Sequence, residues 1–171
     1  GHYNLYEVLD ATILNLYYYD GCWRISSIKG YDIGNFAFSD GKTYSEVFMH
    51  IVGLNYKNFS LDNLPRENNY TIALRYEKFH LFDETKHIYS KSALKSYLYV
   101  LQTYNLRTMK ITNDVYCGGI PYQSPITIKS AKNVMILVDY AKHAYSKYMK
   151  AYSTNQYKYK PLYGYILRAS N

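Results

Sequence analysis

An Asp-Gly pair between two β-rich arms constrains the fold of this chain more than any other feature. The arms are Thr12–Tyr19 and Cys22–Ile28, and Asp20-Gly21 joins them. A type I′ turn needs positive φ at both central residues, so an Asp-Gly pair in this setting is the strongest short-range signal for a β-hairpin. Lys29-Gly30 then interrupts the second arm. We therefore predict a two-stranded antiparallel ribbon whose open end lies near Lys29.

The length of 171 residues is typical of one domain, and we expect residues 1–171 to form a single domain. A domain of this size buries about 70% of the surface that its unfolded chain exposes. We set Gly1-His2 aside as a cloning scar and expect no signal peptide. No apolar run approaches the roughly 18 residues that a membrane-spanning helix needs, so no membrane partner is expected.

The titratable residues offer no pattern of a catalytic or metal site. Cys22 and Cys117 lie far apart and favour free thiols over a disulfide, which predicts an intracellular, reducing compartment. The five histidines lack ligand spacing, so we expect no metal. Gly118-Gly119 has no strand-to-helix context and is interpreted as a turn rather than a phosphate loop. The chain contains the residue types of a Cys–His nucleophile, in Cys22 or Cys117 and the histidines, but no other feature supports one.

Net charge and aromatic content both suggest polyanionic partners. The chain carries 20 Lys and Arg against 13 Asp and Glu, a formal charge of +7. This excess attracts polyanions such as RNA without specifying a fold. The 24 tyrosines favour strands and can stack on bases or contact protein partners. Codon bias of an AT-rich genome explains the same richness, and both explanations stay open.

The expected elements are mostly strands, with two or three helices. Thr43 and Glu46 form a capping box for a helix that we expect to end at Gly53. Tyr70–Tyr76 alternates and predicts a strand. The other expected elements are a loop over Leu54–Asn69 with a short turn at Leu61–Leu64, a turn at Phe82–Glu84, a strand at His87–Ser90, a helix or strand at Ser92–Leu101, strands at Leu106–Thr112 and Leu162–Arg168, and a loop at Asn113–Pro125. This predicts an α+β fold with a mainly antiparallel sheet.

The C-terminal third contains a candidate RNA-binding surface. A helix is predicted over Ala131–Tyr152, capped by Ser130, with an apolar stripe on one face and lysines on the other. A segment that alternates tyrosine with lysine follows the helix. Lysines contact phosphates and tyrosines stack on unpaired bases, although a solvated helix face and a linker would look the same. The candidate residues are Lys142, Lys147, Lys150, Tyr157, Lys158, Tyr159 and Lys160.

Two short motifs at the predicted hairpin resemble RNA ligases and related nucleotidyltransferases. In that family a Lys-x-Asp-Gly element begins the hairpin, and a motif containing Ser and Lys or Arg, followed by Gly, ends its return strand. The matching stretches here are Val8–Thr12 and Ser26–Gly30. The resemblance implies the nucleotidyltransferase domain fold of RNA ligases. It also implies nucleotide- or phosphate-binding roles for Asp10, Thr12, Ser27, Lys29, Arg75 and Arg168.

This sequence departs from the family where the chemistry occurs. Val8 replaces the lysine that takes the nucleotidyl group, and Ala11 replaces the glycine. Ala73 or Arg75 stands where the family has a glutamate that contacts the nucleotide sugar. Tyr163 precedes Gly164 where a metal-associated glutamate is expected. Valine has no nucleophilic atom, so the resemblance implies a ligase-like domain with no catalytic residue and no cofactor.

The sequence leaves three functions open. The first is a non-catalytic ligase-like domain that binds RNA or a nucleotide, or serves as an interaction module. Trp23–Phe48 and Tyr70–Tyr76 also resemble ligase-like proteins of large DNA viruses, which predicts a viral protein in the infected-cell cytoplasm or the virion. The second is an active RNA ligase that uses ATP and Mg. The third is a structural virion protein with no nucleic-acid ligand.

Overall fold

The computed structural model describes residues 3–9, 11–39, 41–76, 81–83, 88–90, 96–123, 133–153 and 162–169. These residues form two compact units, which are described separately. The larger unit spans residues 11–122, and the smaller unit combines residues 1–10 with 123–171. The expectation that residues 1–171 form one domain stays a prediction. No helix in these ranges is long and apolar enough to cross a membrane.

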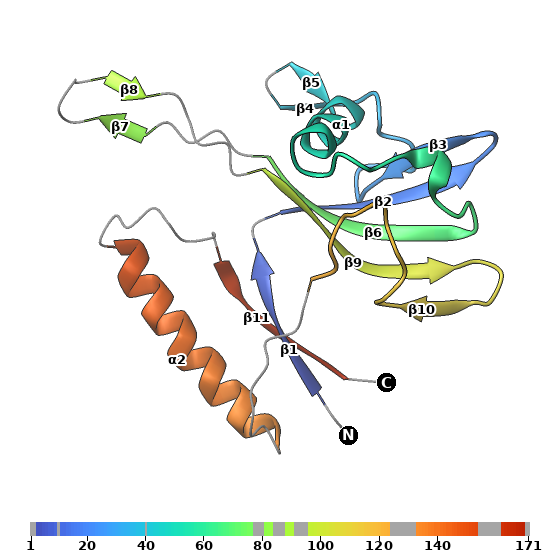
Figure 1. Cartoon of the computed structure of the whole chain (residues 1–171). Coiled ribbons are helices and arrows are strands. Elements are labelled where there is room, and N and C mark those ends of the chain that lie inside the picture. Colours follow the sequence, from blue (N-terminus) through green and yellow to red (C-terminus); the bar gives the residue numbers. More distant parts are fainter. Residues whose placement is uncertain are drawn as a thin grey trace. The chain divides into compact units, whose positions relative to one another are not determined.

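A five-stranded antiparallel sheet forms the centre of the larger unit (Figure 1). Its strands, in spatial order, are β10 (Lys110–Thr112), β9 (Tyr97–Asn105), β6 (Asn68–Arg75), β2 (Thr12–Tyr19) and β3 (Cys22–Ser26). Two small antiparallel pairs accompany it, β4 (Ala37–Ser39) with β5 (Lys42–Thr43) and β7 (Leu81–Asp83) with β8 (Ile88–Ser90). The 3-10 turn η1 (Leu61–Asn63) confirms the short turn expected there.

The predicted hairpin is confirmed as β2 and β3. Its register pairs Tyr19 with Cys22, and Asp20 and Gly21 form the turn with φ of 48° and 85°. Positive φ at both positions is the type I′ geometry whose twist matches that of the flanking strands. The hairpin therefore follows directly from two residues of sequence.

Helix α1 (Tyr44–Asn55) covers one face of the sheet. Its start is confirmed, because the Glu46 backbone N–H donates to Thr43 Oγ1 at 3.2 Å. The helix buries an apolar stripe against strands β2, β6 and β9. The expected end at Gly53 is wrong: the helix continues to Asn55, where Tyr56 caps it through its N–H to the Val52 carbonyl. The Tyr56 hydroxyl also donates to the Leu98 carbonyl, which anchors the end of the helix to β9.

The smaller unit consists of a two-stranded antiparallel ribbon and one long helix (Figure 1). The ribbon pairs β1 (Tyr3–Leu9) with β11 (Leu162–Ala169), and the helix is α2 (Val134–Ser153). The strand expected at Leu162–Arg168 is thus confirmed. Within the described residues, α2 begins three residues later than predicted. Asn133 Oδ1 accepts from the Ile136 N–H at 3.1 Å and serves as its cap, and Ser130 lies outside the described residues.

The fold class is confirmed at the level of an α+β protein with two α-helices and mostly antiparallel sheets in the described part of the chain. Besides the end of α1, two local predictions are wrong. Residues 106–109 form the turn between β9 and β10 rather than part of a strand, because Asn105 Oδ1 accepts from the N–H groups of Arg107 and Thr108 and closes an Asx turn. Phe82 and Asp83 belong to β7 rather than to a turn. For Ser92–Leu101, residues 97–101 adopt the strand alternative as part of β9.

Candidate functional site

The β1–β11 ribbon brings together two motifs that are about 150 residues apart in sequence. Val8, at the position of the family's lysine, pairs directly with Gly164 of the second motif. Directly opposed residues in an antiparallel pair share a face and lie about 5 Å apart. The structure therefore places Val8 opposite the glycine that follows Tyr163, the position of the family's second glutamate.

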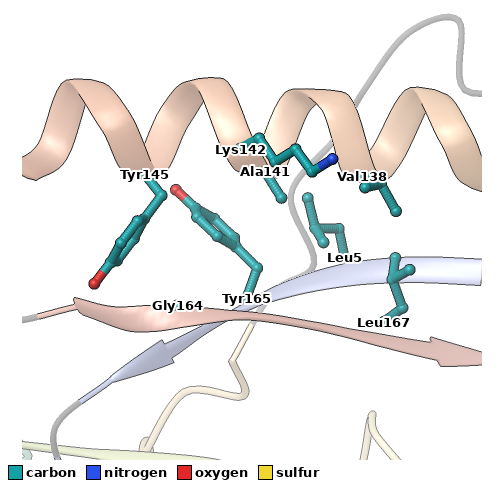
Figure 2. Close-up of a pocket in the computed structure, with 8 residues that line it drawn as sticks. All are labelled: Leu5, Val138, Ala141, Lys142, Tyr145, Gly164, Tyr165 and Leu167. Carbon is teal, nitrogen blue, oxygen red and sulfur yellow. The ribbon is translucent and has the colours of Figure 1, made fainter.

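The ribbon has two distinct faces. One, which we call the Val8 face, carries the register pairs Asn4–Arg168, Tyr6–Ile166 and Val8–Gly164. The other carries Leu5–Leu167 and Glu7–Tyr165 and faces α2 (Figure 2). Side chains alternate between faces along a strand, so a residue on one face cannot assist chemistry on the other.

Arg168 lies on the Val8 face but at a distance from Val8. Its guanidinium carbon is 4.9 Å from the centroid of the buried Tyr6 ring, a cation–π contact. Arg168 lies four positions after Gly164, which is about 13 Å along a strand. Arg168 could contact a phosphate on this face only as a neighbour of the Val8–Gly164 pair.

Thr12, Ser27 and Lys29 lie at the open end of the β2–β3 hairpin, as expected. The last registered pair, Asn15–Ser26, is three residues beyond Thr12. Ser27 and Gly30 exchange backbone hydrogen bonds in a tight turn, and the Lys29 N–H donates to Ser27 Oγ at 3.0 Å. The exposed Lys29 ammonium is 5.8 Å from the centroid of the Tyr44 ring. This end of the hairpin thus presents the Lys29 ammonium group beside an ordered turn.

Arg75 lies apart from Thr12, on the opposite face of the sheet. Thr12 pairs with Leu74 on the face that α1 covers, whereas Arg75 and Ala73 pair with Tyr97 and Tyr99 on the other face. Arg75 is buried, with only 6% of its surface exposed. The structure therefore does not bring Arg75 together with Thr12, although both were expected to bind a nucleotide or phosphate.

Sequence reasoning missed a polar and aromatic surface on this second face, which we call the tyrosine face. Register places four tyrosines and three small polar residues on it, and most of them are partly exposed. The tyrosine face consists of Tyr17, Tyr97, Tyr99, Tyr104, Asn15, Thr71 and Gln102. The alternation of Tyr97 and Tyr99 in β9 was the sequence signal available for this face. The alternation in Tyr70–Tyr76 had likewise predicted a strand with two distinct faces.

Two contacts hold the tyrosine face in place. Thr71 Oγ1 donates to Asn15 Oδ1 at 3.0 Å across β2 and β6. The rings of Tyr97 and Tyr99 are tilted against each other with centroids 4.9 Å apart. Such cross-strand and same-face pairs fix side-chain orientation, so these rings are held in defined positions on the sheet surface.

The lysines of α2 do not share one face as predicted. Lys142 lies toward the ribbon, beside Val138, Ala141 and Tyr145 (Figure 2). At 100° per residue, Lys147 lies about 180° around the helix from Val138, and Lys150 about 120°. All three are exposed. The predicted lysine face is therefore limited to Lys147 and Lys150, and Lys142 belongs to the side that faces the ribbon.

Several predicted site residues lie outside the described residues, namely Asp10, Tyr157, Lys158, Tyr159 and Lys160. Burial raises the pKa of the Cys117 thiol to about 12, so this cysteine stays protonated at neutral pH and is a poor nucleophile. Across the ranges that the structure describes, no three His, Cys, Asp or Glu side chains gather as metal ligands would.

A search of curated proteins finds a similar viral protein. Over 130 residues the chain is 29% identical to the "Putative RNA-ligase" of African swine fever virus. The match covers 63% of this chain but 27% of the viral protein, so this chain spans about a quarter of that relative. No family model matches the sequence. No solved structure matches it either. The chain is thus similar in part to a viral protein described as a ligase.

Proposed function

We propose that this chain is a viral ligase-like domain that binds RNA or a nucleotide without forming a covalent nucleotidyl intermediate. The observation that carries the proposal is the place of Val8 opposite Gly164. The resemblance puts the attacking amine at residue 8, and a valine side chain contains only carbon and hydrogen. Nucleotidyl transfer through that position is therefore chemically impossible.

The neighbours of Val8 on the ribbon support this proposal. The Val8 face otherwise carries the amide of Asn4, the phenol ring of Tyr6, the branched alkyl side chain of Ile166 and the guanidinium of Arg168. A guanidinium stays protonated at all ordinary pH values and cannot serve as the missing nucleophile. Among the described residues of β1 and β11, no lysine replaces the one that Val8 lacks.

The tyrosine face supports base binding. Proteins that bind single-stranded nucleic acid present aromatic rings on sheet surfaces, because every base has a flat face on which a ring can stack. Tyr99 and Tyr104 supply such rings, and Gln102 and Asn15 supply donors and acceptors between them. An RNA base stacked there would be held by contacts that require no covalent step.

Labelled nucleotides test the absence of chemistry. Wild-type protein incubated with ATP or GTP labelled at the α-phosphate, with Mg²⁺, is expected to give no labelled band after denaturing electrophoresis. The variant Val8→Lys is expected to remain unlabelled as well, because Ala73 or Arg75, together with Tyr163, also replaces carboxylates that assist the family's reaction. Val8 is 38% exposed, so lysine fits there without burying a charge. A covalent adduct on the wild-type protein would refute the proposal.

Salt dependence tests whether the lysines of α2 contact RNA. The double variant Lys147→Ala/Lys150→Ala is expected to lower the slope of log K against log salt for single-stranded RNA by about 1.4, because each phosphate contact contributes about 0.7. Fluorescence anisotropy between 50 and 200 mM salt measures the slope. Lys57→Ala, at an exposed position of the larger unit, is the matched control and should leave the slope unchanged. Equal slopes for all three proteins would exclude these two lysines from the RNA contact.

A further inference from the structure

A groove of about 400 Å³ runs between α2 and the β1–β11 ribbon (Figure 2). Leu5, Val138, Ala141 and Leu167 give it apolar walls. The stretch of helix from Val138 to Tyr145 and the stretch of strand from Gly164 to Leu167 are each about 10 Å long. Binding sites for small organic molecules have volumes of roughly 300–1,000 Å³ and mostly apolar linings, so the groove has the size and character of one.

Three polar groups are set into this apolar lining. In Figure 2, Tyr145 extends from α2 toward the ribbon and Tyr165 from the ribbon toward α2, with their hydroxyl groups at opposite ends. Lys142 is the one charged side chain among the described residues that line the groove. Its aliphatic stem lies along the helix while its ammonium group stays accessible, an arrangement in which lysine covers apolar surface and still pairs with an anion.

Tyr165 is suited to donate a hydrogen bond in this groove. Burial raises the pKa of its hydroxyl, and the nearby Glu7 carboxylate and Tyr140 raise it further. Glu7 is the cross-strand partner of Tyr165. A phenol with a raised pKa keeps its proton at neutral and mildly alkaline pH, so it remains a donor.

We propose that the groove binds a small amphipathic organic anion, in which an apolar body lies between α2 and the ribbon and a single carboxylate or sulfonate pairs with Lys142. A nucleic-acid strand fits this site poorly, because strands require several cations and the groove lining offers one. The site lies on the ribbon face opposite Val8, so it does not depend on the proposed function.

A matched pair of dyes tests the charge requirement. The probe 8-anilinonaphthalene-1-sulfonate carries an aromatic body and one sulfonate, and N-phenyl-1-naphthylamine is its neutral counterpart. Lys142→Ala is expected to weaken binding of the sulfonate dye by about threefold to fivefold, typical of a partly exposed ion pair. Binding of the neutral dye should change less than about twofold. Lys147→Ala is the control, because Lys147 lies on the far side of the helix from Val138, and should leave both affinities unchanged.

A steric variant tests the location. Ala141→Trp places a large ring between the helix and the ribbon, and it should weaken both dyes by about tenfold or more because the apolar area available to them is lost. His143→Trp adds the same ring at an exposed helix position outside the groove and should leave both affinities unchanged. Circular dichroism verifies that each variant folds. Unaltered dye binding by folded Ala141→Trp, or a wild-type dissociation constant weaker than about 1 mM, would overturn the proposal.

Discussion

Replacing Gly118 with alanine is expected to lower the free energy of unfolding by about 3 kcal/mol. A Cβ at this position would lie 2.3 Å from Cδ2 of Phe59 and 2.9 Å from Cε2. Phe59 cannot yield easily, because its ring packs edge-on against Phe48 of α1 at 6.0 Å between centroids. Gly118 also has φ of 60°, which costs an alanine about 1–2 kcal/mol by itself. Urea or thermal unfolding followed by circular dichroism measures the change.

The neighbouring glycine separates the steric effect from backbone strain. Gly119 has φ of 90°, but a Cβ there meets nothing within 4 Å. Gly119→Ala should therefore show the strain alone, about 1 kcal/mol. If the two variants lose the same stability, Phe59 does not pack over Gly118 as described.

Replacing Tyr99 with leucine is expected to weaken binding of single-stranded RNA by roughly tenfold. A base stacked on an aromatic side chain is stabilised by about 1–3 kcal/mol, and leucine keeps the bulk but not the ring face. Tyr99 is partly exposed and lies across from Ala73 of β6. Fluorescence anisotropy with a labelled unstructured oligonucleotide at about 50 mM salt measures the loss.

The conservative variant Tyr99→Phe is the control for this experiment. It keeps the ring and removes only the hydroxyl, so affinity should stay within about threefold of wild type. Equal losses in Tyr99→Leu and Tyr99→Phe would assign the effect to the hydroxyl and contradict stacking. Wild-type protein without measurable affinity at low salt would remove RNA from the proposed function and favour a nucleotide.

The sequence predicted the elements whose signals are local. Asp20-Gly21 specifies the hairpin through its own backbone preferences, and Thr43 specifies the start of α1 through one hydrogen bond. The predicted end of α1 at Gly53 was wrong because glycine is only a weak helix breaker. The helix instead continues to the residue before Tyr56, whose hydroxyl donates a hydrogen bond to the carbonyl of Leu98, 42 residues away. Tertiary contacts of this kind override a local preference.

The candidate site depended on pairings that no local pattern reveals. No local pattern indicates that residues 3–9 form a strand, because that strand is completed only by β11. The tyrosine face was missed for a related reason: its members come from β2, β6 and β9, and their register becomes known only in the folded sheet. The resemblance to RNA ligases did identify Val8 and Gly164 separately, and the structure pairs them.

The pairing of β1 with β11 also has a consequence for the order of folding. Strand β1 is synthesised before the larger unit, yet its partner begins at Leu162. At typical rates of translation, on the order of ten seconds separate the synthesis of the two strands. The larger unit, which is continuous from residue 11 to residue 122, can form in that interval. Strand β1 meanwhile exposes unpaired backbone groups, to which chaperones can bind during synthesis.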